Sequence, residues 1–403
     1  MSVLLLILGL ILFIGLVVIH EFGHFTVARR NGVEAEEFGI GFPPRLWVKR
    51  IKSKRGDFDF TLNALPIGGF VKLKGEHDAD TQKGTFGAAS LKVKAKIMLA
   101  GVAMNLVVAL VLFTAVALVG MPQIISKSSG VINEDQFTVA SDERITRNDV
   151  VTYGIVADSP AAAAGIQSGD VLVSVSVIGQ EPIALTEPQQ LSEWTSQNAG
   201  QEVAIELRRD GQTQTVSATL LSEEEVEASR NSDGAVTKGY LGLSDLALIQ
   251  TKRYTWSAPV VAVGLSGQIT KLTFQGIGTA LKGLGSAIAG LVTFNSEARQ
   301  QGQADASEQV SGPLGIFFVL KASAESGFIM LLFIIAFISL ALAIMNILPI
   351  PALDGGRLYL TLIYRALNKP LTQKAEEAIV GTSFAALMIL FILITIVDAK
   401  RFF

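Results

Sequence analysis

Long uncharged runs of apolar residues alternate along this chain with polar stretches. Residues 3–19 carry no charge and continue into the apolar stretch that ends at Ala28, which predicts a helix over 1–28. A helix rises 1.5 Å per residue, so about 20 apolar residues cross the hydrocarbon core of a bilayer. Further runs predict spanning helices over 97–121, 327–348 and 378–397. The pattern therefore predicts an α-helical polytopic membrane protein with four transmembrane helices.

The first run also invites comparison with a signal peptide. A signal peptide begins with basic residues and ends at a cleavage site of small residues. This N-terminus has neither Lys nor Arg, and its apolar run ends in His20-Glu21-Phe22-Gly23-His24. A membrane span is therefore the favoured interpretation.

Charge then orients the spans. Residues 29–96 carry fourteen Lys or Arg, and basic loops lie on the cytoplasmic side of membranes. This rule places 29–96 in the cytoplasm and the N-terminus outside. Lys400 and Arg401 oppose it mildly at the other end of the chain.

Within this loop, polar and apolar residues alternate over 57–63 and again over 70–74, on either side of Pro66-Ile67-Gly68-Gly69. Alternation around a turn signal predicts a β-hairpin. The hairpin could be an ordinary cytosolic one, or its edge could pair with an unfolded substrate strand.

Residues 123–222 change to polar, strand-like alternation. Ser159-Pro160-Ala161 opens a short helix, Gly165 ends it, and Gly169-Asp170 leads into another strand. This stretch resembles a PDZ domain, an α+β fold that binds peptides by strand addition. A spacer of the same shape without a ligand is the alternative. Residues 223–312 then form a polar linker and apolar, Gly-rich segments. Residues 257–294 could be a further span, but amphipathic helices on the outer surface or packed on the bundle are preferred.

Composition supports a membrane protein, since half of the 403 residues are hydrophobic and only 17% are charged. A net charge of −3 gives no reason to expect a nucleic-acid partner. The chain has no Cys, which excludes disulfides and Cys-ligated zinc, and it has only three His.

Two of these histidines carry the candidate chemistry. His20 and His24 lie four residues apart on one helical face, and Glu21 follows the first of them, in the H-E-x-x-H pattern of zinc peptidases. Catalytic zinc needs a third protein ligand and an open position for water. Both His77 and Asp354 are candidates. Asp354 is preferred because it reaches the cytoplasmic edge of its span, as His20 does about 25 Å along the first helix.

The chain resembles the site-2 protease class of intramembrane zinc metalloproteases, of the bacterial regulator-of-sigma-E type. The resemblance rests on His20-Glu-Phe-Gly-His24, Pro66-Ile-Gly-Gly-Phe-Val-Lys72, Gly101-Val-Ala-Met-Asn105, Val310-Ser-Gly-Pro-Leu-Gly315 and Asn346-Ile-Leu-Pro-Ile-Pro-Ala-Leu-Asp354-Gly-Gly356. It implies one Zn²⁺ per chain on His20, His24 and Asp354, with Glu21 as general base. It also implies that substrate is handled by Asn346 and pairs with a membrane-associated strand of the hairpin, which includes Ile67, Gly68, Gly69, Phe70 and Val71.

By the same resemblance, the substrates are single-pass membrane proteins already cut on their outer side, such as an anti-sigma factor, or a signal-peptide remnant. The enzyme would lie in a bacterial inner membrane, with its active site near the cytoplasmic side and its PDZ domain outside. A peptide ligand of that domain is a further expected partner. Two other classes of protein remain possible from the residues alone: a membrane scaffold, which needs no zinc motif, and a metal-ion transporter, which needs polar residues along several spans.

Overall fold

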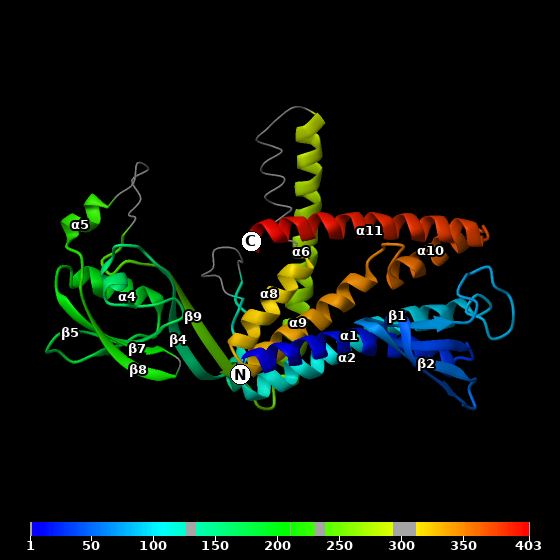
Figure 1. Cartoon of the computed structure of the whole chain (residues 1–403), viewed down its shortest axis with the longest axis horizontal. Helices are drawn as coiled ribbons and strands as arrows, with labels where there is room; N and C mark the ends of the chain where they lie inside the picture. The colour runs from blue at the N-terminus through cyan, green and yellow to red at the C-terminus, as the bar shows by residue number, and fades with distance from the viewer. Residues whose placement is uncertain (1, 126–133, 210, 230–237, 293–311, 403) are drawn as a thin grey trace. The chain divides into compact units, whose positions relative to one another are not determined.

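The computed structural model describes residues 2–125, 134–209, 211–229, 238–292 and 312–402 (Figure 1). The chain divides into two compact units. The helical unit comprises Met1–Val119, Phe137–Val139 and Thr255–Phe403, and the sheet unit comprises Gly120–Gln136 and Ala140–Tyr254. Each unit has its own core.

Four helices among the described residues are long and apolar enough to cross a membrane. They are α1 (Ser2–Arg30), α2 (Leu91–Val119), α9 (Phe328–Ile347) and α11 (Gln373–Phe402). Each of the four predicted spans thus corresponds to a helix of sufficient length and apolar character. The helices α2 and α11 begin six and five residues before their predicted starts, because a helix continues through the polar residues that flank an apolar run.

The bundle packs around α1, α2 and α9, with α8 (Pro313–Glu325) against α1. Leu16, Leu320, Leu331 and Ile335 form its apolar centre. Half of the most apolar stretch of α9 is buried, whereas none of the corresponding stretch of α11 is. Helix α11, red in Figure 1, therefore presents its apolar surface outward.

Residues 258–292 form one continuous helix, α6 (Ala258–Val292), where the sequence suggested either a span or several amphipathic helices. Its first half packs on α2 and α9 through Ala258, Val261, Ala262 and Leu265. It is not among the four helices of the described chain that are apolar enough to span. The predicted polar segment 297–309 lies outside the described residues.

A small sheet in the helical unit is built from two long, bent strands, β1 (Ala35–Ile51) and β2 (Phe58–Leu73). Residues 37–40 of β1 lie between the two halves of β2, because they pair with 59–62 on one side and with 69–72 on the other. The second half of β1 pairs with 58–63. The order of segments is therefore 45–51, 58–63, 35–40, 69–73.

The predicted hairpin is thus wrong in its pairing. Residues 57–63 and 70–74 are not partners; they flank the same segment of β1. Pro66 to Gly69 bends β2 instead of reversing it, with Gly68 at φ +87°. The chain reverses at residues 52–57, between the two strands.

The described residues of the sheet unit form seven strands in the order β3-β9-β4-β5-β7-β8, with β6 beside β5. The strands are β3 (Met121–Pro122), β4 (Arg144–Ile155), β5 (Val171–Val177), β6 (Ile183–Ala184), β7 (Glu202–Arg209), β8 (Gln212–Thr219) and β9 (Leu243–Arg253). The helices of this unit are the short 3₁₀ turn Ala140–Asp142, α3 (Pro160–Ala163), α4 (Pro188–Gln197) and α5 (Glu223–Ala228). The side chain of Ser159 caps α3 by accepting from the Ala162 amide, as its Ser-Pro-Ala start suggests.

The sheet unit extends beyond residue 222, where its predicted boundary lay. Strand β9 pairs with β4 from Arg144↔Arg253 to Ile155↔Leu243, so it belongs to the same sheet. The predicted linker therefore contains both α5 and this strand. Its residues 230–237 lie outside the described part of the chain.

Candidate metal centre

Three side chains from opposite ends of the sequence meet at the end of α1. His20 and His24 project from one face of that helix, and Asp354 begins α10 (Asp354–Ala366). Oδ2 of Asp354 lies 2.9 Å from Nε2 of His20 and 3.0 Å from Nε2 of His24, and the two ring nitrogens are 3.1 Å apart. Both histidines are buried, with 7% of each residue's surface exposed.

This triangle has nearly the size that a zinc ion requires. Zinc bonds of 2.0–2.1 Å in a tetrahedron separate neighbouring ligand atoms by about 3.3 Å. The three measured separations of 2.9–3.1 Å fall just short of that value. The donor set of two imidazoles and one carboxylate, with a position left for water, is one that catalytic zinc sites use. Within the described residues this is the group of His, Asp and Glu side chains that could hold a metal.

The neighbouring helix α2 leaves room for the site. A Cβ on Gly101 would lie 2.5 Å from Cε1 of His20 and from Nε2 of His24. Only glycine fits there, because any larger residue would push the rings out of place. The histidine rings thus occupy the space that a side chain at this position would fill.

The geometry of Asp354 depends on the chain between α9 and α10. Helix α9 ends at Ile347, and the Pro349 and Pro351 turn follows. A Cβ on Gly355 would lie 2.5 Å from the Ile347 carbonyl oxygen, and one on Gly356 would lie 1.8 Å from that of Ile350. The Gly-Gly pair therefore lets α10 fold back tightly onto the turn, which brings its first residue to the histidines.

Each histidine ring is held by its other nitrogen. Nδ1 of His24 donates to the carbonyl oxygen of Ile97 at 2.7 Å, which leaves Nε2 free to bind a metal. Nδ1 of His20 lies 3.3 Å from the side-chain amide of Asn105. Among the described residues, Oδ1 of Asn105 has no hydrogen-bond partner. Rotating the side-chain amide of Asn105 by 180° exchanges its oxygen and nitrogen. After this rotation, Oδ1 of Asn105 accepts a hydrogen bond from Nδ1–H of His20, and Nε2 of His20 is then free to bind a metal.

Asn105 is thus a site residue whose role the sequence did not assign. A lone asparagine in a span usually joins helices, and Asn105 does so too, because Oγ of Ser339 in α9 donates to its carbonyl oxygen at 2.8 Å. The available signal was its place one helical turn beyond Gly101. That spacing puts both residues on the face of α2 toward α1.

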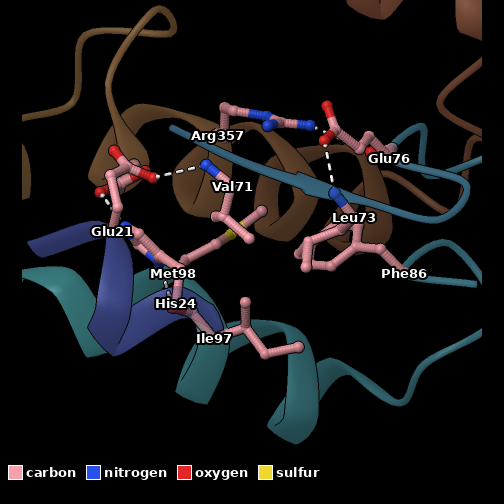
Figure 2. Close-up of a pocket in the computed structure, with 10 residues that line it drawn as sticks. Glu21, His24, Val71, Leu73, Glu76, Phe86, Ile97, Met98 and Arg357 are labelled. Atoms are coloured by element: carbon pink, nitrogen blue, oxygen red, sulfur yellow. Dashed lines mark hydrogen bonds and ion pairs between the residues drawn. The ribbon is translucent and has the colours of Figure 1, made fainter. Parts of the chain in front are cut away.

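Glu21 lies beside the metal site in a cavity of about 160 Å³. Its Oε2 accepts a hydrogen bond from the backbone amide of Val71 at 3.2 Å, as Figure 2 shows. The cavity is lined by Glu21, His24, Val71, Leu73, Glu76, Phe86, Ile97, Met98, Asp354 and Arg357. Its wall therefore combines five apolar side chains with five charged or titratable ones, and it includes a carboxylate near the metal ligands.

The opposite end of the cavity is closed by polar contacts. The Leu73 amide donates to Oε1 of Glu76 at 2.9 Å (Figure 2). Arg357, three residues after Asp354, donates to the carbonyl oxygen of Glu76 at 3.0 Å and to Oε1 of Glu376 at 3.3 Å. Arg357 therefore joins the helix that carries Asp354 to the end of β2 and to the start of α11.

Burial alone would raise the pKa of the Asp354 carboxyl. The ring nitrogens of His20 and His24 beside it outweigh burial and lower that pKa, so the group is anionic at neutral pH. An anion at this point, between two imidazoles, attracts a divalent cation.

His77, the rival ligand, lies elsewhere. Its ring nitrogens face Glu376 at 3.9 Å and Glu377 at 3.5 Å, and it is not part of the metal-binding group. Asn346 donates to the Leu342 carbonyl of its own helix and does not line the cavity.

Of the predicted substrate-binding stretch, Val71 lines the cavity. Gly68 and Gly69 lie against Val17 and Val18 of α1, and Phe70 stacks on Phe42 with ring centroids 6.2 Å apart. The side chain of Ile67 lies outside what the structure describes.

Comparison with known proteins gives a consistent result. The sequence profile of peptidase family M50 matches residues 8–390. A protein of Clostridium acetobutylicum named as a zinc metalloprotease is 31% identical over 397 residues, covering 98% of this chain and 96% of its own. Zinc metalloprotease Rip1 of Mycobacterium tuberculosis is 27% identical over 387 residues (92% and 88% covered). Regulator of sigma-E protease RseP of Salmonella typhimurium is 25% identical over 448 residues (90% and 91% covered).

Each match covers most of this chain and most of the relative, and all three relatives are named as proteases. The family profile includes both His20 and Asp354, which lie at opposite ends of the matched range. The chain therefore belongs to peptidase family M50, the site-2 proteases, and is a zinc-dependent metalloendopeptidase.

Proposed function

We propose that this protein hydrolyses peptide bonds within the transmembrane segments of single-pass membrane proteins. One observation carries the proposal: the three metal-binding side chains and Glu21 meet on a helix that is itself long and apolar enough to cross a membrane. His20, His24 and Asp354 are the zinc ligands, and Glu21 is the general base.

His20, His24 and Asp354 would hold a zinc ion, which would polarise the scissile carbonyl and lower the pKa of a water molecule toward about 7. Glu21 is placed to accept a proton from the attacking water and to pass it to the leaving amine. Its distance of 3.2 Å to the Val71 amide supports this role, because the hydrogen bond holds the carboxylate beside the metal ligands. His24 keeps its Nε2 aimed at the site through its bond to Ile97.

A helical substrate must be unwound before cleavage, because its carbonyl groups are engaged in hydrogen bonds of its own. Segment 69–73 is an outer segment of the small sheet, and its Val71 amide points toward Glu21. An extended substrate adds to this edge by backbone hydrogen bonds, as in strand addition. Ile67, Gly68, Gly69, Phe70 and Val71 form the platform, and Asn346 turns from its own helix to hold the substrate.

The sheet unit is an extracytoplasmic PDZ domain that takes a peptide or excludes substrates with bulky outer domains. Its support is the capped α3, the strand order and the packing of α4 over the sheet core. The basic residues of 29–96 support a cytoplasmic location for the metal site, in a bacterial inner membrane. The substrates are an anti-sigma factor or a signal-peptide remnant, after a first cut outside.

Replacing Glu21 tests the mechanism. We expect Glu21→Gln to retain zinc and to lower cleavage of a model transmembrane substrate by about 10²–10⁴-fold, the range for loss of a general base. Glu377→Gln is the matched control, because this exposed carboxylate faces His77 instead of the metal site. Cleavage that persists in the Glu21 variant at the rate of the control would refute the proposal.

A further inference from the structure

The end of β1 and the turn that leads to β2 carry a cluster of exposed cations, which we call the basic turn: Lys49, Lys52, Lys54 and Arg55. Arg30, the last residue of α1, is exposed as well. A local concentration of like charge is unfavourable unless an anion or water offsets it. The surroundings of the cluster therefore indicate what it binds.

The acidic residues near the basic turn are already engaged. Asp59 pairs with Arg50 at 3.1 Å, Glu34 pairs with Lys74 at 2.8 Å, and Asp57 accepts from the Ser53 amide at 3.1 Å. Within the described part of the chain, none of the four cations of the basic turn forms an ion pair. The cluster is thus available to an anion from outside the chain.

The basic turn lies at the end of a membrane span. Arg29, near the end of α1, donates to the Gly56 carbonyl oxygen at 2.8 Å, and its guanidinium lies 4.6 Å from the ring centre of Phe58. These contacts fix the turn at the depth where α1 leaves its apolar stretch. Lipid headgroups lie at that depth.

Exposed apolar side chains extend from beside the basic turn to the far end of the same sheet. Phe42, Leu46, Trp47 and Leu65 show between 45% and 72% of their surface. Gly68, beside Phe42, lies against Val17 of α1. Val17 precedes Arg29 by twelve residues, or about 18 Å along the helix. The sheet therefore runs beside α1 with its far end at the depth of the hydrocarbon and its basic end at the surface.

We propose that the basic turn binds the headgroups of anionic phospholipids, next to the exposed apolar side chains of the same sheet. Basic clusters directly beside a membrane span bind anionic lipids, with about 1 kcal/mol per Lys or Arg near the surface. A soluble acidic protein or a nucleic acid would match the charge but not the exposed Phe, Leu and Trp. The membrane matches both features at once.

The proposed contact goes beyond the peptidase reaction. The bound sheet also carries segment 69–73, and Val71 on it contacts Glu21. Anionic lipid would therefore hold a wall of the catalytic cavity at a fixed depth. The lipid contact itself can be measured without any substrate, so its failure is distinguishable from failure of the proposed reaction.

Trp47 is the probe for this contact. The chain has three tryptophans, so Trp194→Phe and Trp256→Phe leave Trp47 alone. The full-length protein is placed in phosphatidylcholine vesicles that contain brominated phosphatidylglycerol or, for comparison, brominated phosphatidylcholine. We expect stronger quenching of Trp47 by the brominated anionic lipid, and we expect added NaCl to reduce that difference.

The basic turn is then neutralised with Lys52→Gln, Lys54→Gln and Arg55→Gln together. We expect its preference for phosphatidylglycerol over phosphatidylcholine to fall by up to about fivefold per charge. The matched control neutralises Arg365, Lys369 and Lys374, three exposed cations at the end of α10, in the connection to α11 and at the start of α11. Zinc content confirms that both variants are folded.

An unchanged preference in the basic-turn variant overturns the proposal. So does an equal loss in the control, because general positive charge would then explain the preference. Inorganic phosphate, added at matched ionic strength, should leave the quenching difference unchanged. If phosphate removes the difference more than chloride does, the site binds free phosphate and the proposal is wrong.

Discussion

Asp354 in the helical unit and Asp170 in the sheet unit are both held inside the protein, but they are neutralised differently. Oδ2 of Asp170 lies 2.6 Å from Nη2 of Arg209, Oδ1 lies 2.7 Å from Nε, and the Gln167 amide donates at 2.8 Å. Asp354 instead meets the ring nitrogens of His20 and His24. Arginine is always charged, whereas a histidine that binds metal is neutral. The chain supplies a permanent cation to Asp170, and Asp354 requires one from outside.

The difference extends to the source of each partner. Asp170 directly precedes β5, and Arg209 ends β7 of the same sheet, 39 residues further along the chain. Their ion pair therefore forms when that sheet forms. Asp354 is 330 residues from His24 and meets it through the packing of α1, α2 and α9. One carboxylate therefore stabilises a local fold, and the other completes a site that the whole helical unit assembles.

The largest effect is expected at Asp354, whose site requires a cation from outside the chain. We expect Asp354→Asn to abolish peptidase activity and to weaken zinc binding by more than about a hundredfold, beyond the range for loss of a residue that only orients a ligand. The cause is the loss of the single anionic ligand. Zinc retained against a chelator and cleavage of a model substrate measure the two effects.

His77→Ala provides the contrast, because His77 faces Glu376 and Glu377 and is outside the metal group. It should leave zinc content unchanged. If His77→Ala loses more zinc than Asp354→Asn, the ligand assignment is wrong.

The next largest effect is expected at the Asp170–Arg209 ion pair. We expect Arg209→Met to destabilise the sheet unit by about 3–5 kcal/mol, because it leaves a buried carboxylate without its cation. Zinc binding should not change. Urea unfolding, followed by the fluorescence of Trp194 in a variant that lacks the other two tryptophans, reports on this unit, since Trp194 packs on its core. The Arg209→Met, Asp170→Asn pair should recover part of the loss.

A smaller effect is expected at Asn105, which orients His20 without binding metal. Asn105→Leu removes the acceptor for Nδ1–H of His20, and losses of this kind cost about 10–100-fold in metal affinity. The control is Val107→Leu, at an exposed position two residues further along α2. Equal zinc affinity in the Asn105 variant and in the control would mean that Asn105 only joins helices.

The sequence predicted best what depends on neighbouring residues. The four spans follow from uninterrupted apolar runs, and the pairing of His20 with His24 follows from helical spacing. The depth of the spans and the family resemblance indicated Asp354, and the structure brings it to both histidines.

Contacts between distant segments were harder to predict. Pro66 to Gly69 has the composition of a turn, and nothing local reveals that residues 37–40 separate the two halves of β2. Strand β9 pairs with a strand about 100 residues earlier and follows a polar stretch, so its place in the sheet could not be read from alternation alone. The contact of Asn105 with His20 depends on how α2 is rotated against α1.

The smallest expected effect is that the Asp170–Arg209 ion pair makes the stability of the sheet unit depend on pH. Burial would raise the pKa of Asp170, but the hydrogen bonds from Arg209 and Gln167 lower it below the ordinary value near 4. Because the folded pKa is lower than the unfolded one, the unfolded sheet unit binds a proton first as the pH falls. The stabilisation is therefore complete above about pH 4 and is lost as the pH falls through the folded value. In the protein that retains Asp170 and Arg209, we expect the urea midpoint reported by Trp194 to fall as the pH drops below about 4. In the Arg209→Met, Asp170→Asn variant this part of the fall should be missing, and an identical pH profile in both proteins would show that the pair does not couple folding to protons.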